Sequence, residues 1–275
     1  MKLLKLIRNI LLFAAAFFLI ERFCRLQTEG FSIAKIIPPN PLKCQEATCP
    51  PEILKALNQP YYFLGSGVQC YAFLSEDKQT VLKFFKHYHL FPSNGLLKKI
   101  PLPNLLKPYQ QEILRMREER LQKIFKSCQI VYDNLQEETG TLFLHFNKSD
   151  CHSVKIVDKL GIAYWLNLSE MEFVLQKKAE TISSRFDRLF QAKNERAIEE
   201  SMEKLKKLYL SCAQKGFKTK DSKIRNYAFI GDEAVAIDIG SFKKIKNLNP
   251  WVIEKGQKKF ERKLEIWRAE FEKNL

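Results

Sequence analysis

Three oxygen-bearing side chains are closely spaced near the C-terminal end of the chain, in the segment GFKTKDSKIRNYAFIGDEAVAIDIGSF. Asp221 and Asn226 are separated by four residues, and Asp238 follows two short apolar runs joined by a Gly-Asp turn. A hairpin of this kind places Asp238 at a strand end, beside the loop that holds Asp221 and Asn226. One acid and one amide can then share a hard divalent cation such as magnesium, which prefers oxygen ligands and accompanies phosphate. The other acid remains free to orient or deprotonate an attacking hydroxyl.

A second group of candidate residues lies in the first predicted strands. Gly65 and Gly67 lie in YYFLGSG, and Lys83 follows 16 residues after Gly67 in the apolar run TVLKFF. Glycines allow a polyphosphate to approach the backbone closely, and a lysine on the neighbouring strand can meet its charge. Both features also have a plain structural interpretation, because glycine pairs are common in turns and a lysine in an apolar strand usually reaches toward water.

Glu118 interrupts the apolar face of a long helix that is predicted to begin near Tyr109. The other positions of this face are apolar and recur in steps of three and four: Leu114, Leu121, Phe125, Cys128, Tyr132 and Leu135. A carboxylate on a buried helix face is costly unless it is paired, and Lys83 is the obvious cation. The alternative is that Glu118 lies where the helix first reaches solvent.

The elements that position these residues are predicted to be strands followed by helices. Strands are expected at YYFLGSG, CYAFLSED, QTVLKFFKHY, TLFLHFN, SVKIVD and GIAYWLNLSEMEFVLQKKA, and helices at roughly 181–193 and 196–214. The C-terminal segment predicts one amphipathic helix with four large apolar side chains on one face: Phe260, Leu264, Trp267 and Phe271.

The composition indicates a globular protein with a basic surface. Of the 275 residues, 45% are hydrophobic and 28% are charged, which excludes a largely disordered chain. Lys and Arg number 46 against 31 Asp and Glu, which favours anionic partners such as nucleotides or phospholipid headgroups. Nucleic acid is not the expected partner, because the sequence has no aromatic-basic RNA motif and no helix-turn-helix signal.

The seven cysteines have no spacing typical of a zinc site. They are interpreted as small buried apolar side chains of a reducing compartment. Cys44 and Cys49, separated by four residues, are the exception, since they could form a disulfide outside the cytosol.

The first 25 residues predict a segment that faces a membrane. Lys2, Lys5 and Arg8 precede the apolar run Ile10–Ile20, as in a signal peptide or signal anchor. No small-residue cleavage site follows, so an uncleaved anchor or an interfacial helix is expected at 1–25. A cleaved signal and a buried core helix are the alternatives. Six prolines in the following stretch predict a linker at 26–60 and one folded domain at 61–275.

In their order and context these motifs resemble the protein kinase-like superfamily. LGSG and VLK match the nucleotide loop and its lysine, a helix glutamate follows, DSKIRN matches D-x-x-x-x-N, and DIG stands in place of D-F-G. The resemblance covers about Tyr61 to Phe242. It implies a two-lobed α+β fold, with a small antiparallel-sheet N-lobe at about 61–178 and a reduced helical C-lobe at about 179–275. The apolar run near the N-terminus predicts that a hydrophobic helix precedes this fold.

The resemblance also implies an ATP- and magnesium-dependent phosphotransferase. Asp221 would be the catalytic base, Lys223 would face the transferred phosphate, and Asn226 and Asp238 would bind magnesium. On the nucleotide side four residues would take part: Gly65 and Gly67 in the phosphate loop, and Lys83 held by Glu118.

The chain departs from the kinase pattern at three motif positions: Thr219-Lys220 replaces His-Arg, Cys70 replaces the third glycine, and Ile239 replaces Phe. Only 37 residues follow Asp238, which is too few for a peptide-binding platform. The resemblance is therefore to minimal members such as the lipopolysaccharide-sugar or RIO type kinases, with protein, lipid or sugar as acceptor. A catalytically inactive kinase-like scaffold is the alternative. Because ATP is scarce outside the cytosol, we expect a cytoplasmic catalytic domain held at a membrane.

Overall fold

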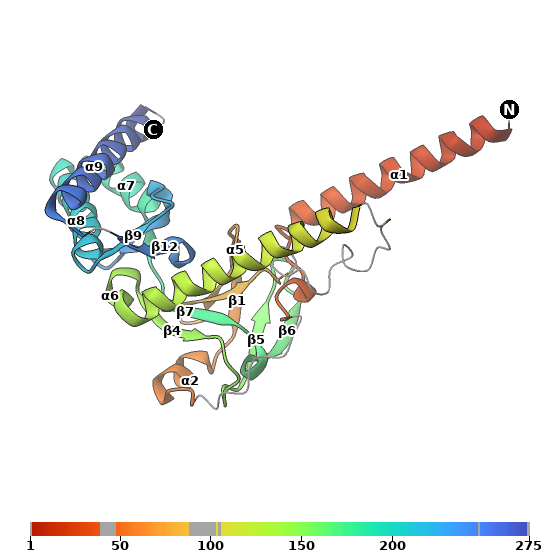
Figure 1. Ribbon diagram of the computed structural model, residues 1–275, viewed down its shortest axis with the longest axis horizontal. Helices are drawn as coiled ribbons and strands as arrows, with labels where there is room; N and C mark the ends of the chain where they lie inside the picture. Colours follow the sequence, from red (N-terminus) through yellow and green to blue (C-terminus); the bar gives the residue numbers. More distant parts are fainter. Residues whose placement is uncertain (1, 39–47, 88–102, 104–105, 247, 274–275) are drawn as a thin grey trace. The chain divides into compact units, whose positions relative to one another are not determined.

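A computed structural model describes residues 2–38, 48–87, 103, 106–246 and 248–273 of the chain. In this part of the chain the fold is α+β, as predicted (Figure 1). It divides into two compact units. Unit 1 comprises Met1–Asp77, Leu82–His89 and Phe146–Glu172. Unit 2 comprises Lys78–Val81, Leu90–His145 and Phe173–Leu275.

The strands of unit 1 form a mixed sheet. Strand β1 (Tyr61–Ser66) pairs antiparallel with β2 (Cys70–Ser75) and parallel with β5 (Ser153–Val157), which pairs antiparallel with β6 (Ala163–Asn167). Strand β3 (Thr80–Phe85), whose first two residues belong to unit 2, lies next to β2. The predicted antiparallel sheet is therefore wrong at one pairing. Strand β5 returns beside β1 after a long crossover, and such a connection permits parallel pairing, which a tight hairpin does not.

Aromatic side chains form the core of unit 1. The ring of Phe31 lies 5.2 Å from that of Tyr71, 5.4 Å from that of Phe73 and 5.9 Å from that of Phe63. Four apolar side chains from the predicted Pro-rich linker are also buried: Phe31, Ile36, Ile53 and Leu57. The short helices of unit 1 are η1 (Ile33–Lys35), α2 (Pro51–Leu57) and η3 (Leu168–Glu170).

Helix α1 (Lys2–Gln27) extends away from the strands of unit 1 as a long helix (Figure 1). Its described side chains are mostly exposed. Among the residues that the structure describes, no helix combines the length and apolar character needed to cross a membrane. The apolar run Ile10–Ile20 is about half of the roughly 20 residues that a span requires, and Arg8, Glu21 and Arg22 flank it. The sequence predicted a membrane localisation, with a hydrophobic N-terminal transmembrane helix as a single anchor. This prediction is therefore wrong.

Unit 2 contains most of the helices. Its elements are α5 (Lys107–Asn134), α6 (Gln136–Thr139), β4 (Thr141–His145), β7 (Phe173–Lys177), β8 (Glu180–Thr181), α7 (Ile182–Gln191), α8 (Glu195–Gln214), β9 (Phe217–Thr219), η4 (Ile224–Asn226), β10 (Tyr227–Ile230), β11 (Glu233–Ala236), η5 (Ile239–Ser241), β12 (Phe242–Lys244) and α9 (Pro250–Lys273). Strand β4 pairs with β7, β8 and β11 both pair with β10, and β9 pairs with β12, all antiparallel.

Local sequence signals explain two helices of unit 2, α8 and α9. The side chain of Asn194 accepts a hydrogen bond from the Ala197 N–H (3.1 Å) and so caps the first turn of α8. The C-terminal amphipathic helix expected from the sequence is present as α9, which packs against α8, and the ring of Phe260 stacks 5.1 Å from that of Tyr209. In Figure 1, α7, α8 and α9 gather beside β9 and β12. Helices α7 and α9 contact η4, and α8 contacts β9, so these helices support the loop that leads into the β10–β11 hairpin.

Candidate functional site

The β10–β11 hairpin brings Asn226 and Asp238 to the same end of two paired strands. Its register pairs Tyr227 with Ala236, and the Ile237 N–H donates to the Asn226 carbonyl oxygen (2.9 Å). Gly231 makes the turn with φ of 59°, a conformation that side-chain-bearing residues rarely adopt. Two residues that are 12 positions apart in sequence thereby become neighbours at the open end of the hairpin.

Asp221 and Lys223 lie in the loop that leads into this hairpin. The Asn226 side-chain Nδ2 donates to the Asp221 carbonyl oxygen (3.1 Å) and lies 3.5 Å from Asp238 Oδ2. The Lys223 Nζ lies 3.1 Å from Asp221 Oδ2, with both side chains more than a third exposed. Unit 2 therefore brings together four predicted site residues: Asp221, Lys223, Asn226 and Asp238.

The oxygen atoms of Asp238 and Asn226 fit a hard cation such as magnesium. Asp238 Oδ1 accepts from the Gly240 N–H (3.2 Å), which orients the carboxylate, while Oδ2 faces the Asn226 amide. The Nδ2 bond to the Asp221 carbonyl fixes the plane of the amide and leaves Oδ1 as the atom for a ligand bond. Within the described residues, no group of three or more His, Cys, Asp and Glu side chains suited to a metal ion is present. The pair would thus need oxygens from phosphate or water to complete a coordination shell.

A short sheet holds Asp221 against the Asp238 turn. Strands β9 and β12 pair Thr219 with Phe242, and the Lys220 N–H donates to the Ser241 carbonyl oxygen (2.8 Å). The Thr219 and Ser241 hydroxyls lie 2.6 Å apart, and the Thr219 hydroxyl oxygen also accepts from the Asp221 N–H (3.2 Å). Thr219 therefore orients the loop through its hydroxyl.

Ser127 is a site-supporting residue that sequence reasoning missed. It is buried on α5, and its hydroxyl donates to the Ile239 carbonyl oxygen (2.6 Å) and accepts from the Phe242 N–H (2.6 Å). Both partners flank the turn that follows Asp238. Ser127 is not part of the predicted apolar face of this helix, and nothing local indicated a partner 112 residues away.

The Ser127→Ala variant is expected to have a free energy of unfolding about 1–3 kcal/mol lower than that of the wild type, because two buried backbone groups lose their partner. Denaturant unfolding measures this change. The control is Ser183→Ala, an exposed serine on α7, for which a change within about 0.5 kcal/mol is expected. Equal stability of the two variants would contradict a role for Ser127 in holding the turn.

Arg185 anchors the other end of the hairpin. It is buried on α7 and donates to Ser201 Oγ (3.1 Å), to the Gly231 carbonyl oxygen (2.9 Å) and to Asp232 Oδ1 (2.9 Å). Its guanidinium lies 4.3 Å from the centre of the Phe229 ring. Since these contacts join α7 and α8 to the hairpin turn, they restrict movement of both strands that lead to Asn226 and Asp238.

Gly65, Gly67 and Lys83 lie in unit 1. A Cβ added at Gly65 would meet no atom of the described residues within 4 Å, and one at Gly67 would meet only the Cys70 carbonyl oxygen, at 3.6 Å. The backbone is therefore open to close approach. Lys83 is half-buried on β3, and Glu118, half-buried on α5 of unit 2, accepts a hydrogen bond from Gln122 Nε2 (2.9 Å). The pairing of Lys83 with Glu118 stays a prediction.

Lys86, which sequence reasoning also missed, closes the glycine turn. Its buried Nζ donates to Ser66 Oγ (2.7 Å) and to the Gly67 carbonyl oxygen, and lies 4.2 Å from the centre of the Tyr71 ring. Its backbone N–H donates to the Gln69 carbonyl oxygen (2.8 Å). Burial lowers the pKa of Lys86. Its position directly after an apolar strand gave no sign that it would turn back to this loop.

The Lys86→Met variant is expected to loosen the glycine turn while keeping the contact with Tyr71. Hydrogen exchange of the Gly67 amide, which is bonded to the Cys70 carbonyl oxygen, should become at least about tenfold faster, since a charge-assisted hydrogen bond contributes about 1.5–3 kcal/mol and about 1.4 kcal/mol corresponds to a factor of ten. The matched control is Lys55→Met, an exposed lysine on α2. Unchanged protection of Gly67 in Lys86→Met would show that the side chain does not hold the turn.

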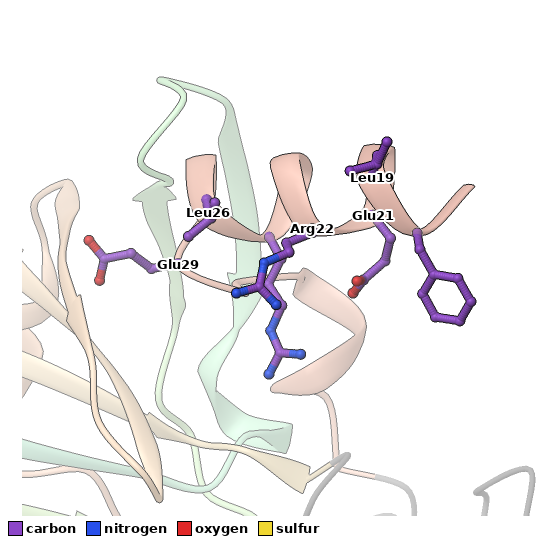
Figure 2. Close-up of a pocket in the computed structure, with 7 residues that line it drawn as sticks. Leu19, Glu21, Arg22, Leu26 and Glu29 are labelled. Carbon is purple, nitrogen blue, oxygen red and sulfur yellow. The ribbon is translucent and has the colours of Figure 1, made fainter. Parts of the chain in front are cut away.

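A groove of about 550 Å³ runs along the C-terminal half of α1. Leu19, Glu21, Arg22, Leu26 and Glu29 contribute to its lining (Figure 2). None of the eight predicted site residues lines this groove. Its mixture of opposite charges and apolar side chains indicates no particular chemistry, so it is not assigned to the site.

Comparisons with known proteins give distant similarity only. No protein-family model and no curated protein matches the chain. Among solved structures, a high-resolution crystal structure of WbdD is similar at 14% identity with a TM-score of 0.36, over 72% of this chain and 35% of that chain. A structure described as the bifunctional kinase-methyltransferase WbdD is similar at 14% identity with a TM-score of 0.38, over 71% and 34%. The chain thus spans about a third of the length of these structures, and functional proposals rest on its own residues.

Proposed function

We propose that the chain is a kinase-like phosphotransferase that moves the terminal phosphate of magnesium-bound ATP to a hydroxyl group of an acceptor. The observation that carries this proposal is the constellation of Asp221, Lys223, Asn226 and Asp238 at the end of one hairpin. Backbone hydrogen bonds orient three of these residues, so little rearrangement is needed before reaction. Phosphoryl transfer depends mainly on positioning and charge neutralisation, which such an arrangement supplies.

Each residue of the constellation has a distinct role in this proposal. Asp238 and the Asn226 amide oxygen would hold magnesium, which supplies charge neutralisation to the phosphates when bound. The Asp221 carboxylate orients the acceptor hydroxyl and accepts its proton. Lys223, at 3.1 Å from Asp221 in the structure, swings to the negative charge of the transferred phosphate, and its long exposed side chain permits this movement.

The nucleotide side of the proposal uses the glycine turn of unit 1. The open backbone at Gly65 and Gly67 allows phosphate oxygens to approach, and Lys86 holds the turn in a single conformation. Lys83, held by Glu118, would contact the phosphates. The acceptor is a hydroxyl on a protein, a lipid or a sugar.

Nucleotide-dependent thermal stabilisation of the full chain tests the proposal. ATP with magnesium is expected to raise the unfolding free energy by about 2.7 kcal/mol when the free nucleotide reaches about 100 times its dissociation constant, and by less without magnesium. Formation of ADP should accompany binding. Absence of any ATP-dependent shift would refute the proposal, whereas magnesium-dependent binding without turnover would favour the kinase-like scaffold.

A further inference from the structure

Two cysteines that are about 100 residues apart in sequence meet inside unit 1. Cys49 lies just before α2, and Cys151 lies between β4 and β5. Both are buried, with 1% and 3% of their surfaces exposed. The backbone N–H of Cys49 donates to Oδ1 of Asp150 (2.6 Å), the residue that directly precedes Cys151.

The two thiols interact with each other, but no disulfide bond joins them. Both are free cysteines, and burial, together with a hydrogen bond to the Cys151 thiol, raises the pKa of Cys49. A metal does not account for the pair, because no third ligand joins it among the described residues. The two buried thiols interact, and the backbone of Cys49 is bonded to the residue before Cys151, so the covalent reaction open to this pair is disulfide formation.

We propose that Cys49 and Cys151 form a dithiol site that is oxidised to a disulfide by exchange with a small-molecule disulfide such as glutathione disulfide. One cysteine thiolate attacks the glutathione disulfide, forming a mixed disulfide and releasing one glutathione. The second cysteine thiolate then attacks the protein sulfur of the mixed disulfide, releasing the other glutathione. In total the two cysteines lose two electrons to the glutathione disulfide. The two glutathione molecules that are released take up the two thiol protons.

Burial sets the kinetics of this reaction. A buried thiol of raised pKa is a poor nucleophile, so exchange in the folded chain requires local opening and is slow. In the unfolded chain both thiols are accessible and exchange is fast. Once formed, the disulfide closes a loop of about 100 residues, which restricts the unfolded state and raises thermal stability.

Peptide mapping of the full chain tests the proposal. The chain is refolded in excess glutathione disulfide, its remaining thiols are alkylated, and it is digested with trypsin without reductant. The expected product joins peptide 44–55 to peptide 149–155. Since peptide 44–55 also contains Cys44, which lies outside the described residues, the product should persist in Cys44→Ser and disappear in Cys49→Ser. The wild-type melting temperature should fall when a dithiol reductant is added.

Three outcomes would overturn the proposal: a disulfide within peptide 44–55, a cross-link that persists in Cys49→Ser, or no cross-linked peptide in the refolded wild type. The Cys212→Ser variant, which changes a buried cysteine of α8, is the matched control and should keep both the cross-link and the reductant-dependent shift. If Cys49→Ser does not fold, fragmentation of the wild-type peptide pair still identifies which cysteine of 44–55 is bonded.

Discussion

The Asp221→Asn variant is expected to transfer phosphate about 10²–10⁴-fold more slowly than the wild type, which is the usual contribution of a general base. The amide cannot accept the acceptor's proton, although it has the size and shape of the carboxylate. The loop should persist, because the hydrogen bonds that orient it use the backbone N–H and carbonyl of residue 221. The turnover number for ADP formation, measured at saturating ATP and magnesium, reports the change.

The matched control for this variant is Asp133→Asn. Asp133 is an exposed acid on α5 whose carboxylate accepts a hydrogen bond from Gln129, so its rate should remain within about twofold of the wild type. ATP-dependent stabilisation should be retained in both variants. A turnover number of Asp221→Asn equal to that of the control would contradict the role of Asp221 as base.

The second large effect is expected for Asp238→Ala, which should lose the magnesium-dependent part of the stabilisation by ATP. The substitution removes the carboxylate whose Oδ2 lies 3.5 Å from Asn226 Nδ2, so magnesium-dependent affinity for ATP should fall by more than about tenfold. Thermal unfolding with ATP, in the presence and absence of magnesium, measures this difference directly.

A separate variant distinguishes the loss of metal binding from a loss of structure. Asp238→Ala also removes the acceptor of the Gly240 N–H, which should cost about 1 kcal/mol of stability. Asp238→Asn keeps that acceptor and removes the charge, so its melting temperature should resemble that of the wild type while its magnesium response is lost. A full magnesium response in both variants would exclude Asp238 as a metal ligand.

The parts of the site that could be predicted from the sequence are those that depend on short-range signals. The alternating apolar residues of YAFI and AVAI and the Gly-Asp turn between them predict a hairpin, and the hairpin alone makes Asn226 and Asp238 neighbours. The amphipathic periodicity of α9 is likewise visible in the sequence.

The supporting residues could not be predicted, because they act through contacts between distant segments. Ser127 carries no signature of a partner 112 residues away, and nothing in the sequence around Lys86 indicates that its side chain donates to Ser66 in the glycine turn. Phe31 lies in a proline-containing stretch that was predicted to be a linker, and its ring lies beside four other rings of unit 1. The contacts of Ser127, Lys86 and Phe31 depend on how distant segments pack together. The local periodicity of the sequence does not specify this packing.

The error at the N-terminus has a different cause. A basic flank before an apolar run is a real signal for membrane proteins, but the run Ile10–Ile20 is too short for a span and charged residues bound it on both sides. The length of an apolar run therefore limits a membrane span more strictly than the charges of its flanks do.

The sequence by itself determined the class of the fold, the hairpin and the types of side chain available at its end, because these depend on the order of residues within a few turns of chain. The tertiary structure alone decided which groups hold that end in place. Ser127 and Thr219 are ordinary residues until folding brings them to the turn after Asp238, where polar groups need partners and these side chains supply them. Arg185 does the same at the opposite end of the hairpin, where it bonds the Gly231 carbonyl oxygen. The meeting of Cys49 with Cys151 has the same origin, since a contact across about 100 residues exists only after the chain has folded.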